Sequence, residues 1–354
     1  MTKREKYDVV IVGGGTAGLS AALTLSRARR AVLVIDSGSP RNAPAGHVHN
    51  YLGREGTPPG ELLAIGRGEV EGYGGEIVTG SATAARALEG GFRVELGRVE
   101  LGRVELGRVE LGDGGSVFAR RLLVTTGLTD ELPEVAGLAE LWGTDVLHCP
   151  YCHGWEVRDR AIGVLATGPM SLHQALMFRQ WSADVTLFLN AAVELTAEQA
   201  EQFAARRIAV VDGQVAAVET AGGRLSGVRL TSGEVFPRQA LVVAPRFTAR
   251  ADVLASLGLE PVVQELNGFV LGSTVPADPT GATAVPGVWV AGNVTDFKAQ
   301  VIVSAAAGLT TAAAINMDLI DEETRDAVAA HRVFSAETER EVSELVLGNR
   351  RHGL

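Results

Sequence analysis

The sequence predicts an α/β protein with two Rossmann-like three-layer domains, and three observations support this. A strand-like run, residues 9–12, leads into a glycine-rich turn and an apolar helix. A similar succession of strand, turn, helix and strand covers residues 161–189. The chain of 354 residues corresponds to about two domains of ordinary size, and its 43 glycines and 46% hydrophobic residues fit an α/β protein with many tight turns.

Composition and charge exclude several classes of partner. The formal net charge is −10, whereas nucleic-acid-binding proteins present basic faces. Residues 1–8 are polar and run directly into a strand, so they lack the apolar core of a signal peptide. We expect no apolar run long enough to span a bilayer. The expected protein is therefore cytoplasmic, with neither a membrane nor a nucleic-acid partner.

The first turn has the spacing of a dinucleotide-binding site, G-x-G-x-x-G, formed by Gly13, Gly15 and Gly18. Gly13 permits the tight turn, Gly15 lets the backbone approach a pyrophosphate, and Gly18 lets helix and strand pack closely. Free N–H groups at the start of the helix would then hold the phosphates. The next strand, residues 31–35, ends in Asp36, at about the distance along the chain where an acid binds a ribose hydroxyl.

Residues 37–60 are rich in Gly, Pro and Asn, which is typical of an irregular loop that passes over a ligand. We call this segment the excursion loop. It contains Arg41, His47, His49 and Asn50, each of which is more often a surface or capping residue than a ligand contact.

Residues 93–112 read RVELG four times. A period of five matches neither helix nor strand, so a bulge at each of Gly97, Gly102 and Gly107 would be needed to keep a strand in phase. An elongated bulged hairpin and a mobile loop are both compatible with this pattern. We favour a tandem expansion of one hairpin turn without a function of its own.

The tail, residues 321–354, is charged and helical in pattern, which suits a solvated or a partner-binding helix.

The second nucleotide-type turn, residues 166–171, departs from the dinucleotide pattern. Only Gly168 is kept, Pro169 removes an N–H group, and Met170 takes the position needed for close packing. The strand that follows ends without an acid for a ribose or an arginine for a 2′-phosphate. We interpret this half as empty or remodelled.

The only two cysteines lie in the stretch His148–Gly154, with the spacing C-x-x-C. The pattern fits a metal half-site, a haem attachment site or a redox disulfide. Two thiolates fall short of the four ligands of a structural zinc site, and haem attachment requires an export signal. We favour a redox pair and expect no metal. The C-x-x-C spacing brings both sulfurs into one turn, and a start near a helix N-terminus lowers a thiol pKa.

A late stretch, residues 290–301, reads Val-Ala-Gly-Asn, then Asp296, Gln300 and Val301. With the first glycine turn and the C-x-x-C before a second unit, it resembles the thioredoxin reductase family of flavoproteins. The resemblance covers nearly the whole chain apart from the RVELG repeat and the C-terminal tail. It implies a discontinuous FAD-binding domain (1–128 and 247–354), an inserted NADPH-domain-like domain (129–246) that carries the cysteines, and a homodimer.

Three departures from the family pattern point to one branch of it. His153 follows the second cysteine where thioredoxin reductases have Asp, the second turn lacks G-x-G-x-x-A and its arginines, and Gly292-Asn293 replaces Gly-Asp. All three resemble the dithiol oxidases that close the disulfides of gliotoxin- and holomycin-type natural products. Such enzymes need no NADPH, because the substrate dithiol supplies the electrons and molecular oxygen accepts them from the flavin.

The resemblance also implies the roles of individual residues. Cys149 is expected to meet the substrate, Cys152 to face the flavin, and His153 to act as acid and base, whereas His148 is expected to be structural. FAD is the expected cofactor, without NADPH. The expected FAD-binding residues are Gly13, Gly15, Gly18 and Asp36 for the ADP half, and Asn50, Thr126, Gly127, Gly292, Asn293, Gln300 and Val301 for the flavin half.

The residues leave three functions open. The first is an FAD-dependent dithiol oxidase that acts on a small dithiol. The second is a disulfide reductase that acts on a thioredoxin-like protein or a small disulfide, with NADPH or another donor such as ferredoxin. The third is a non-enzymatic flavin-bearing redox sensor, although a sensor would not need both thiols.

Overall fold

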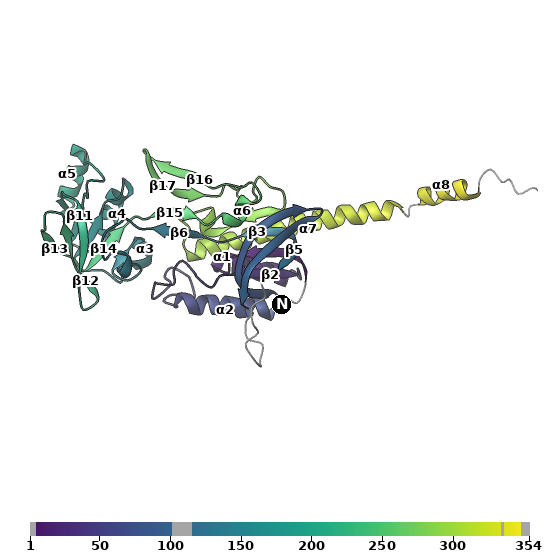
Figure 1. The fold of residues 1–354 in the computed structure, drawn as a ribbon, viewed down its shortest axis with the longest axis horizontal. Coiled ribbons are helices and arrows are strands. Elements are labelled where there is room, and N and C mark those ends of the chain that lie inside the picture. The colour runs from purple at the N-terminus through teal and green to yellow at the C-terminus, as the bar shows by residue number, and fades with distance from the viewer. Residues whose placement is uncertain (1–4, 101–114, 334–335, 348–354) are drawn as a thin grey trace, which may run out of the picture.

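The computed structural model describes residues 5–100, 115–333 and 336–347. It consists of two α/β units that lie side by side and are joined by a narrow connection (Figure 1). The larger first unit contains both the N-terminal segment and helix α7 near the C-terminus. The smaller second unit is formed by the middle of the chain.

The first unit is built on a parallel sheet in which β1 pairs with β2 on one side and with β5 on the other. β3 extends the sheet beyond β2, and β18 extends it beyond β5. β4 pairs antiparallel with both β3 and β5, so the pairing closes into a ring. The strands are β1 (Lys6–Val12), β2 (Val32–Asp36), β3 (Glu76–Leu88), β4 (Gly91–Glu100), β5 (Ser116–Val124) and β18 (Val288–Val290).

Both faces of this sheet are buried, as is usual for parallel strands. Val9 and Ile11 of β1 pack on one side against α1 (Thr16–Arg27) and α7 (Val301–Val333). Val10 and Val12 pack on the opposite side, against the β3–β4 ribbon and α6 (Asp252–Ala255). Helix α2 (Pro59–Gly72), which has Pro59 in its first turn, packs against α1.

Helix α7 corrects one of our expectations. By length and composition its segment Val301–Arg332 is apolar enough to cross a membrane, so the expectation of no such run is wrong. In the structure 33% of its most apolar window is buried, and Ala312, Ile315 and Leu319 pack in the core beside α1. Small residues allow this contact: a Cβ on Gly308 would lie 2.0 Å from the carbonyl oxygen of Ala17.

The second unit has a fully parallel sheet in the order β10, β9, β8, β14, β7. Helices α4 (Met170–Phe178) and α5 (Ala197–Ala205) belong to this unit, and residues of both are buried in one cluster on the sheet. An antiparallel sheet of β11, β12 and β13 encloses the other cluster. The strands are β7 (Val146–Leu147), β8 (Ile162–Leu165), β9 (Val185–Phe188), β10 (Ala209–Val211), β11 (Val215–Ala221), β12 (Arg224–Leu230), β13 (Val235–Pro237) and β14 (Ala240–Val243).

The chain passes between the units through two strands, β6 (Leu128–Glu131) and β15 (Arg246–Ala249), which pair antiparallel. A hairpin formed by β16 (Val262–Leu266) and β17 (Phe269–Thr274) adds to β15. Figure 1 shows this hairpin extending over the connection toward the second unit. The remaining short elements are η1 (Ala139–Leu141), α3 (Pro150–His153) and η2 (Gly292–Val294), and α8 (Ala336–Leu347) lies in the tail.

The first copy of the RVELG repeat lies in β4, and its glycine behaves as expected. Between the pairs Gly80–Val99 and Ala82–Leu96 the register shifts, with one more residue on β4 than on β3. This bulge contains Gly97, so the prediction is confirmed there. The expected bulges at Gly102 and Gly107 lie outside the described residues.

Candidate redox site

Cys149 and Cys152 form a disulfide, with their Cα atoms 5.2 Å apart. Pro150 opens the short helix α3, and Cys149 caps it: the Cys149 Sγ accepts a hydrogen bond from the Cys152 N–H at 3.2 Å. A redox-active cysteine pair forms a disulfide when it is oxidised, so this bond favours the redox interpretation of the C-x-x-C spacing. Within residues 5–100, 115–333 and 336–347 there is no group of three or more His, Cys, Asp or Glu side chains placed to hold a metal.

The disulfide lies in a cavity of about 1110 Å³ between the two units. Most of the predicted site residues line this one cavity, whereas Gly18, Asn50 and Gly292 do not. Those that do are Gly13, Gly15, Asp36, Thr126, Gly127, Cys149, Cys152, His153, Asn293, Gln300 and Val301.

The first glycine turn has the geometry of a dinucleotide cradle. Gly13 has a φ of +108°, which favours glycine, and a Cβ on Gly18 would lie 2.0 Å from the Gly13 carbonyl oxygen. A Cβ on Gly15 would meet no protein atom within 4 Å, so the cavity side of Gly15 is open. Thr125, a residue that our sequence analysis missed, fixes the turn by donating a hydrogen bond to the Gly13 carbonyl at 2.8 Å.

Asp36 lies at the end of β2, beside this turn. Its carboxylate accepts a hydrogen bond from the Gly14 N–H at 3.1 Å and pairs with Arg67 of α2. Arg67 gave no signal in the sequence, because it lies within an ordinary amphipathic helix. Asp36 lines the cavity beside the glycine turn, which is the arrangement needed for contact with a ribose.

Two helices direct their N-terminal ends at the cavity. Gly15 caps α1 without a side-chain hydrogen bond, and the first turn of α1 has no acid. Gln300, which also lines the cavity, precedes α7, whose first turn has no acid either. Free N–H groups at helix starts attract anionic groups such as a pyrophosphate or a reduced flavin. The residues present therefore fit FAD.

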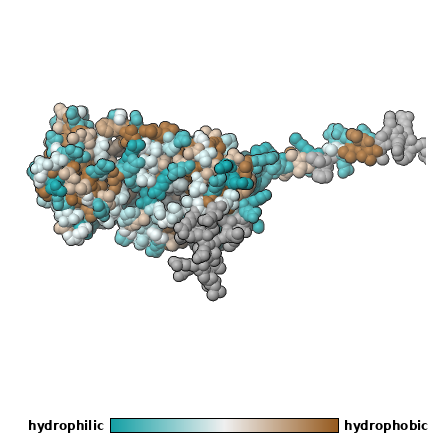
Figure 2. Space-filling model, viewed as in Figure 1, coloured by the Kyte–Doolittle hydropathy of each residue, from teal (hydrophilic) through white to brown (hydrophobic). Residues whose placement is uncertain are grey.

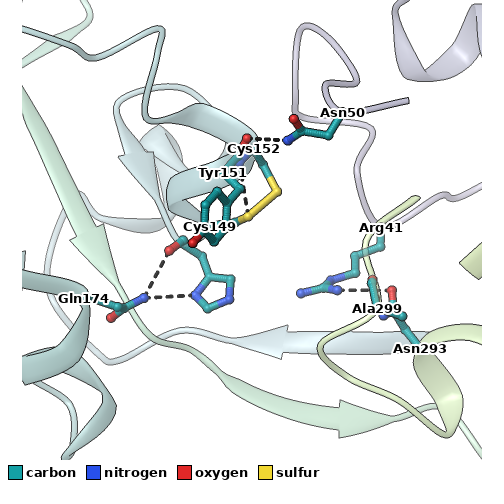
Figure 3. Close-up of a disulfide and its surroundings, with 9 residues drawn as sticks. Arg41, Asn50, Cys149, Tyr151, Cys152, Gln174, Asn293 and Ala299 are labelled. Carbon is teal, nitrogen blue, oxygen red and sulfur yellow. Dashed lines mark hydrogen bonds between the residues drawn. A yellow bond between two sulfur atoms is a disulfide. The ribbon is translucent and has the colours of Figure 1, made fainter. Parts of the chain in front are cut away.

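Asn293 holds the turn that leads into α7. Its Nδ2 donates to the carbonyl oxygens of Asp296 and Ala299, both at 2.9 Å, and its Oδ1 accepts from Arg41 at 3.2 Å (Figure 3). An aspartate could not donate these two hydrogen bonds. The amide at this position therefore has a structural purpose that the sequence pattern did not reveal. Gly292, with a φ of +77°, is buried beside Ala17 of α1.

A cluster that the sequence did not predict lies between this turn and the disulfide. The Arg41 guanidinium lies over the ring of Phe247, with 5.5 Å between its carbon and the ring centroid. Phe247 stacks on Phe297 at 5.3 Å and meets the ring of His148 edge-on at 5.0 Å. These four side chains come from four separate segments of the chain, so no pattern of neighbouring residues could predict the cluster.

His148 is held as a neutral side chain. Gln174 donates from Nε2 to the His148 carbonyl oxygen at 3.0 Å and lies 3.3 Å from the ring nitrogen Nδ1 (Figure 3). Burial, with a smaller contribution from the positive charge of Arg41, lowers the pKa of His148 to about 4. A histidine that is neutral and bonded in this way suits the structural role expected for it.

His153 ends helix α3 and lines the cavity. Burial lowers the pKa of His153, Glu156 opposes this effect, and His49 adds to it. His49 itself connects two acids: its Nδ1 is 2.6 Å from Glu55 and its Nε2 is 3.4 Å from Glu156. His153 is thus neutral at pH 7 and able to accept a proton.

Asn50 connects the excursion loop to the disulfide helix. Its Nδ2 donates to the Tyr151 carbonyl oxygen at 2.7 Å, and its backbone N–H donates to Glu55 at 2.8 Å (Figure 3). The structure therefore places Asn50 against α3 and not on the cavity wall. Thr126, by contrast, lines the cavity and donates to the Arg250 carbonyl at 2.5 Å.

Comparisons with known proteins show the family of the chain. A sequence profile described as pyridine nucleotide-disulphide oxidoreductase matches residues 7–313. The chain is 32% identical over 300 residues to the thioredoxin reductase tcpT of Claviceps purpurea, which covers 83% of this chain and 88% of tcpT.

Solved structures are similar over almost the whole chain. The crystal structure of HlmI has a TM-score of 0.82 and 40% identity, and the match covers 95% of this chain and 99% of HlmI. An oxidoreductase from Agrobacterium tumefaciens has a TM-score of 0.78 and 36% identity, over 89% of this chain and 99% of its own. The predicted fold class and the resemblance to thioredoxin reductase-like enzymes are confirmed.

Proposed function

The chain belongs to the pyridine nucleotide-disulphide oxidoreductase family and is an oxidoreductase acting on sulfur groups; we propose that it is an FAD-dependent dithiol oxidase with molecular oxygen as the final acceptor. One observation carries the proposal. The disulfide shares a cavity with a well-formed dinucleotide turn, while the second nucleotide turn is covered by a side chain. A Cβ built on Gly168 would lie 3.3 Å from the ring of Phe269.

FAD is proposed to lie along the cavity with its ADP half on the first glycine turn and its flavin near the start of α7. Gly13, Gly15, Gly18 and Asp36 would hold the ADP half. The flavin half would lie near the remaining predicted residues: Thr126, Gly127, Gly292, Asn293, Gln300 and Val301, with Asn50 positioning the disulfide helix. When bound, FAD would supply two-electron transfer from the reduced cysteine pair to oxygen, and the two electrons with two protons would convert oxygen to hydrogen peroxide.

The protein's own chemistry is thiol–disulfide exchange. One substrate thiolate attacks the Cys149 Sγ, the Cys149–Cys152 bond breaks, and its electron pair leaves on Cys152. The second substrate thiolate then attacks the substrate sulfur of the mixed disulfide, which closes the substrate disulfide and releases Cys149 as a thiolate. The substrate loses two electrons and two protons, and the cysteine pair gains the electrons.

His153 is proposed to take a proton from a substrate thiol. Burial lowers its pKa, so the neutral imidazole is the dominant form at pH 7 and can act as a base. The thiolate, and not the thiol, is the nucleophile, so this proton transfer determines how much substrate is reactive. Glu156 opposes the effect of burial and would stabilise the imidazolium that forms.

A small substrate fits the site better than a protein. The disulfide lies in a cavity between the units, and the Asn50–Tyr151 hydrogen bond holds the excursion loop against its helix. A thioredoxin-like partner would have to reach both sulfurs past this loop.

We also propose a homodimer in the cytoplasm. Exposed apolar residues of α7, such as Leu309 and Ile320, offer a surface for a second copy.

A second candidate function is a disulfide reductase, which the name of the relative tcpT favours. Anaerobic mixing of the purified yellow protein with dithiothreitol or with NADPH separates the two. Bleaching of the flavin absorbance by dithiothreitol alone, with recovery in air, supports the oxidase. Rapid bleaching by NADPH would overturn it in favour of the reductase.

A further inference from the structure

We infer that His49 is a second base of the redox site and takes the proton of the second substrate thiol. The inference rests on the proposed function, because it completes the proton transfers in the exchange between a dithiol and the Cys149–Cys152 pair. His49 belongs to the excursion loop of the first unit, whereas His153, the base already proposed, belongs to the second unit. Each unit therefore supplies one base to the cavity.

The proposed exchange needs two proton acceptors. Two substrate thiols must become thiolates in succession, because only the thiolate attacks sulfur. A neutral imidazole accepts one proton. Once His153 holds the proton of the first thiol, it cannot take the proton of the second thiol until it has released the first. A second histidine in the same cavity removes this requirement.

Histidines are concentrated around the disulfide. Five of the seven histidines of the chain line the cavity that contains it, namely His47, His49, His148, His153 and His173. His148 is already bonded to Gln174, which suits a structural role. Among the residues that the structure describes, His49 is the one of these five that forms an ion pair with a carboxylate. His49 is therefore the histidine best placed to act as the second base.

Glu55 fixes the orientation of the His49 ring. The Nδ1 of His49 is 2.6 Å from one carboxylate oxygen of Glu55, and the other oxygen accepts a hydrogen bond from the Asn50 N–H at 2.8 Å. The loop is closed behind these contacts, because Val48 and Thr57 pair as a β-bridge. A carboxylate that binds the Nδ1–H leaves the lone pair on Nε2 and stabilises the imidazolium that forms when Nε2 takes a proton.

Two acids stabilise a proton on His49. The hydrogen bonds from His49 and Asn50 lower the pKa of Glu55, so this carboxylate is ionised at neutral pH. Glu156 lies 3.4 Å from the Nε2 of His49, farther than the usual hydrogen bond of about 2.9 Å, so Nε2 is free to accept a proton. The side chain of Glu55 is 65% exposed, which gives the proton a way out to water.

The excursion loop brings His49 to the disulfide helix. The Nδ2 of Asn50, the next residue, donates to the carbonyl oxygen of Tyr151 at 2.7 Å, and Tyr151 lies between the two cysteines (Figure 3). Glu156, the second acid beside His49, is three residues past His153. A dithiol at the disulfide therefore has both bases within the same cavity.

The β16–β17 hairpin supplies no base of this kind, because it contains no histidine. Its Glu265 lines the cavity, but a carboxylate is a much weaker base than an imidazole. Five of its apolar side chains are 38–51% exposed, namely Val262, Val263, Leu266, Phe269 and Val270. In Figure 2 a hydrophobic band follows the upper edge of the molecule, where Figure 1 places the hairpin. The second base therefore comes from the excursion loop.

The step assigned to His49 closes the substrate disulfide. The Nε2 of His49 takes the proton of the second substrate thiol, and the resulting thiolate attacks the substrate sulfur of the mixed disulfide on Cys149. The bond between that sulfur and Cys149 breaks, and its electron pair leaves on Cys149. The substrate disulfide forms, and the proton passes from His49 to solvent.

The test isolates this step in the FAD-loaded Cys152→Ser protein, which cannot reverse the first attack because its resolving thiol is absent. Cys149 is activated with dithiobis(nitrobenzoate), and dithiothreitol then forms the mixed disulfide. Intact mass spectrometry after acid quenching follows the loss of the bound dithiothreitol at pH 7. We expect His49→Gln to slow this loss about 10²-fold, the contribution of a positioned base.

His173→Gln is the matched control, because His173 lines the same cavity and the structure shows no carboxylate paired with it among the described residues. It should leave the rate unchanged. Imidazole in solution should restore much of the rate of His49→Ala, since a soluble base can replace a missing base but not a missing structural contact.

A rate for His49→Gln equal to that of the control would overturn the inference, as would a slow His49→Ala protein that imidazole does not restore. The isolated step involves no electron transfer to the flavin, so its outcome is separate from that of the proposed function. If dithiothreitol failed to bleach the flavin of the unaltered protein, the proposed function would be contradicted, whereas the role of His49 would still be decided by the isolated step.

Discussion

The guanidinium of Arg41 binds both carboxylate oxygens of Asp130, with distances of 2.7 and 2.6 Å. Arg41 belongs to the excursion loop, and Asp130 lies on β6, where the chain leaves the first unit. The same guanidinium donates to Asn293 and lies over Phe247 of β15, the returning strand. One cation therefore fixes the loop to both connecting strands and to the turn before α7.

We expect Arg41→Ala to destabilise the protein by about 3 kcal/mol, because it leaves the carboxylate of Asp130, only 8% exposed, without its partner. Urea unfolding followed by tryptophan fluorescence measures this change. Arg86→Ala is the control: its pair with Glu95 is exposed on the surface, so the expected cost is below about 1 kcal/mol. Equal effects of the two substitutions would contradict the role given to Arg41.

Two glycines of the first turn should respond differently to the same substitution. Gly18→Ala places a Cβ 2.0 Å from the Gly13 carbonyl oxygen, so it should cost about 1–3 kcal/mol of stability even without FAD. Gly15→Ala meets no protein atom within 4 Å, so the apoprotein should keep its stability. Its methyl group would instead fill the space of the pyrophosphate, and we expect FAD affinity to fall at least about tenfold.

Thermal unfolding of the apoprotein and titration with FAD test this pair. Gly60→Ala, in α2 and with open space around its Cβ, is the control and should lower neither quantity. If Gly15→Ala bound FAD as tightly as the unaltered protein, the cofactor would not lie on this turn.

His153→Gln should slow anaerobic flavin reduction by dithiothreitol about 10²-fold, because a positioned base typically contributes this much. The loss should shrink as the pH approaches the thiol pKa, where substrate thiolate forms without a base. FAD content should stay the same. His331→Gln, on the exposed part of α7, is the control. A rate for His153→Gln that equals the control at pH 7 would remove His153 from the mechanism.

The stability of the protein should depend on pH through His148. Burial lowers its pKa to about 4, so between about pH 6.5 and 4 the unfolded chain binds a proton that the folded protein does not. The free energy of unfolding should therefore fall as the pH falls through this window, by up to about 3 kcal/mol from this residue. His148→Gln should reduce the difference between urea titrations at pH 7 and pH 4.5, and what remains includes the contribution of His153, whose pKa is also lowered by burial. A variant that kept the whole difference would contradict this assignment.

The sequence could predict what depends on local spacing. The strand, turn and helix around Gly13, Gly15 and Gly18 follow from glycine positions and from runs of β-branched residues. The C-x-x-C pair needs only one helical turn to bring its sulfurs together. The bulge at Gly97 follows from the mismatch between a five-residue repeat and the two-residue period of a strand.

Contacts between distant segments could not be predicted in this way. Arg41 and Asp130 are 89 residues apart, and Phe269 reaches Gly168 only because the hairpin extends over the connection between the units. Asn50 is a second example. The sequence places it in the excursion loop, but its hydrogen-bond partner, the carbonyl oxygen of Tyr151, belongs to the second unit.

In the proposed function, the Cys149–Cys152 pair passes electrons from a dithiol to oxygen without a pyridine nucleotide. The most direct measurement is the ratio of hydrogen peroxide formed to dithiothreitol oxidised by the FAD-loaded protein in air, with no NADPH present. We predict one peroxide per disulfide, and loss of the reaction in Cys149→Ser with FAD still bound. Peroxide formation that persisted in Cys149→Ser, or a reaction that required NADPH, would contradict the account.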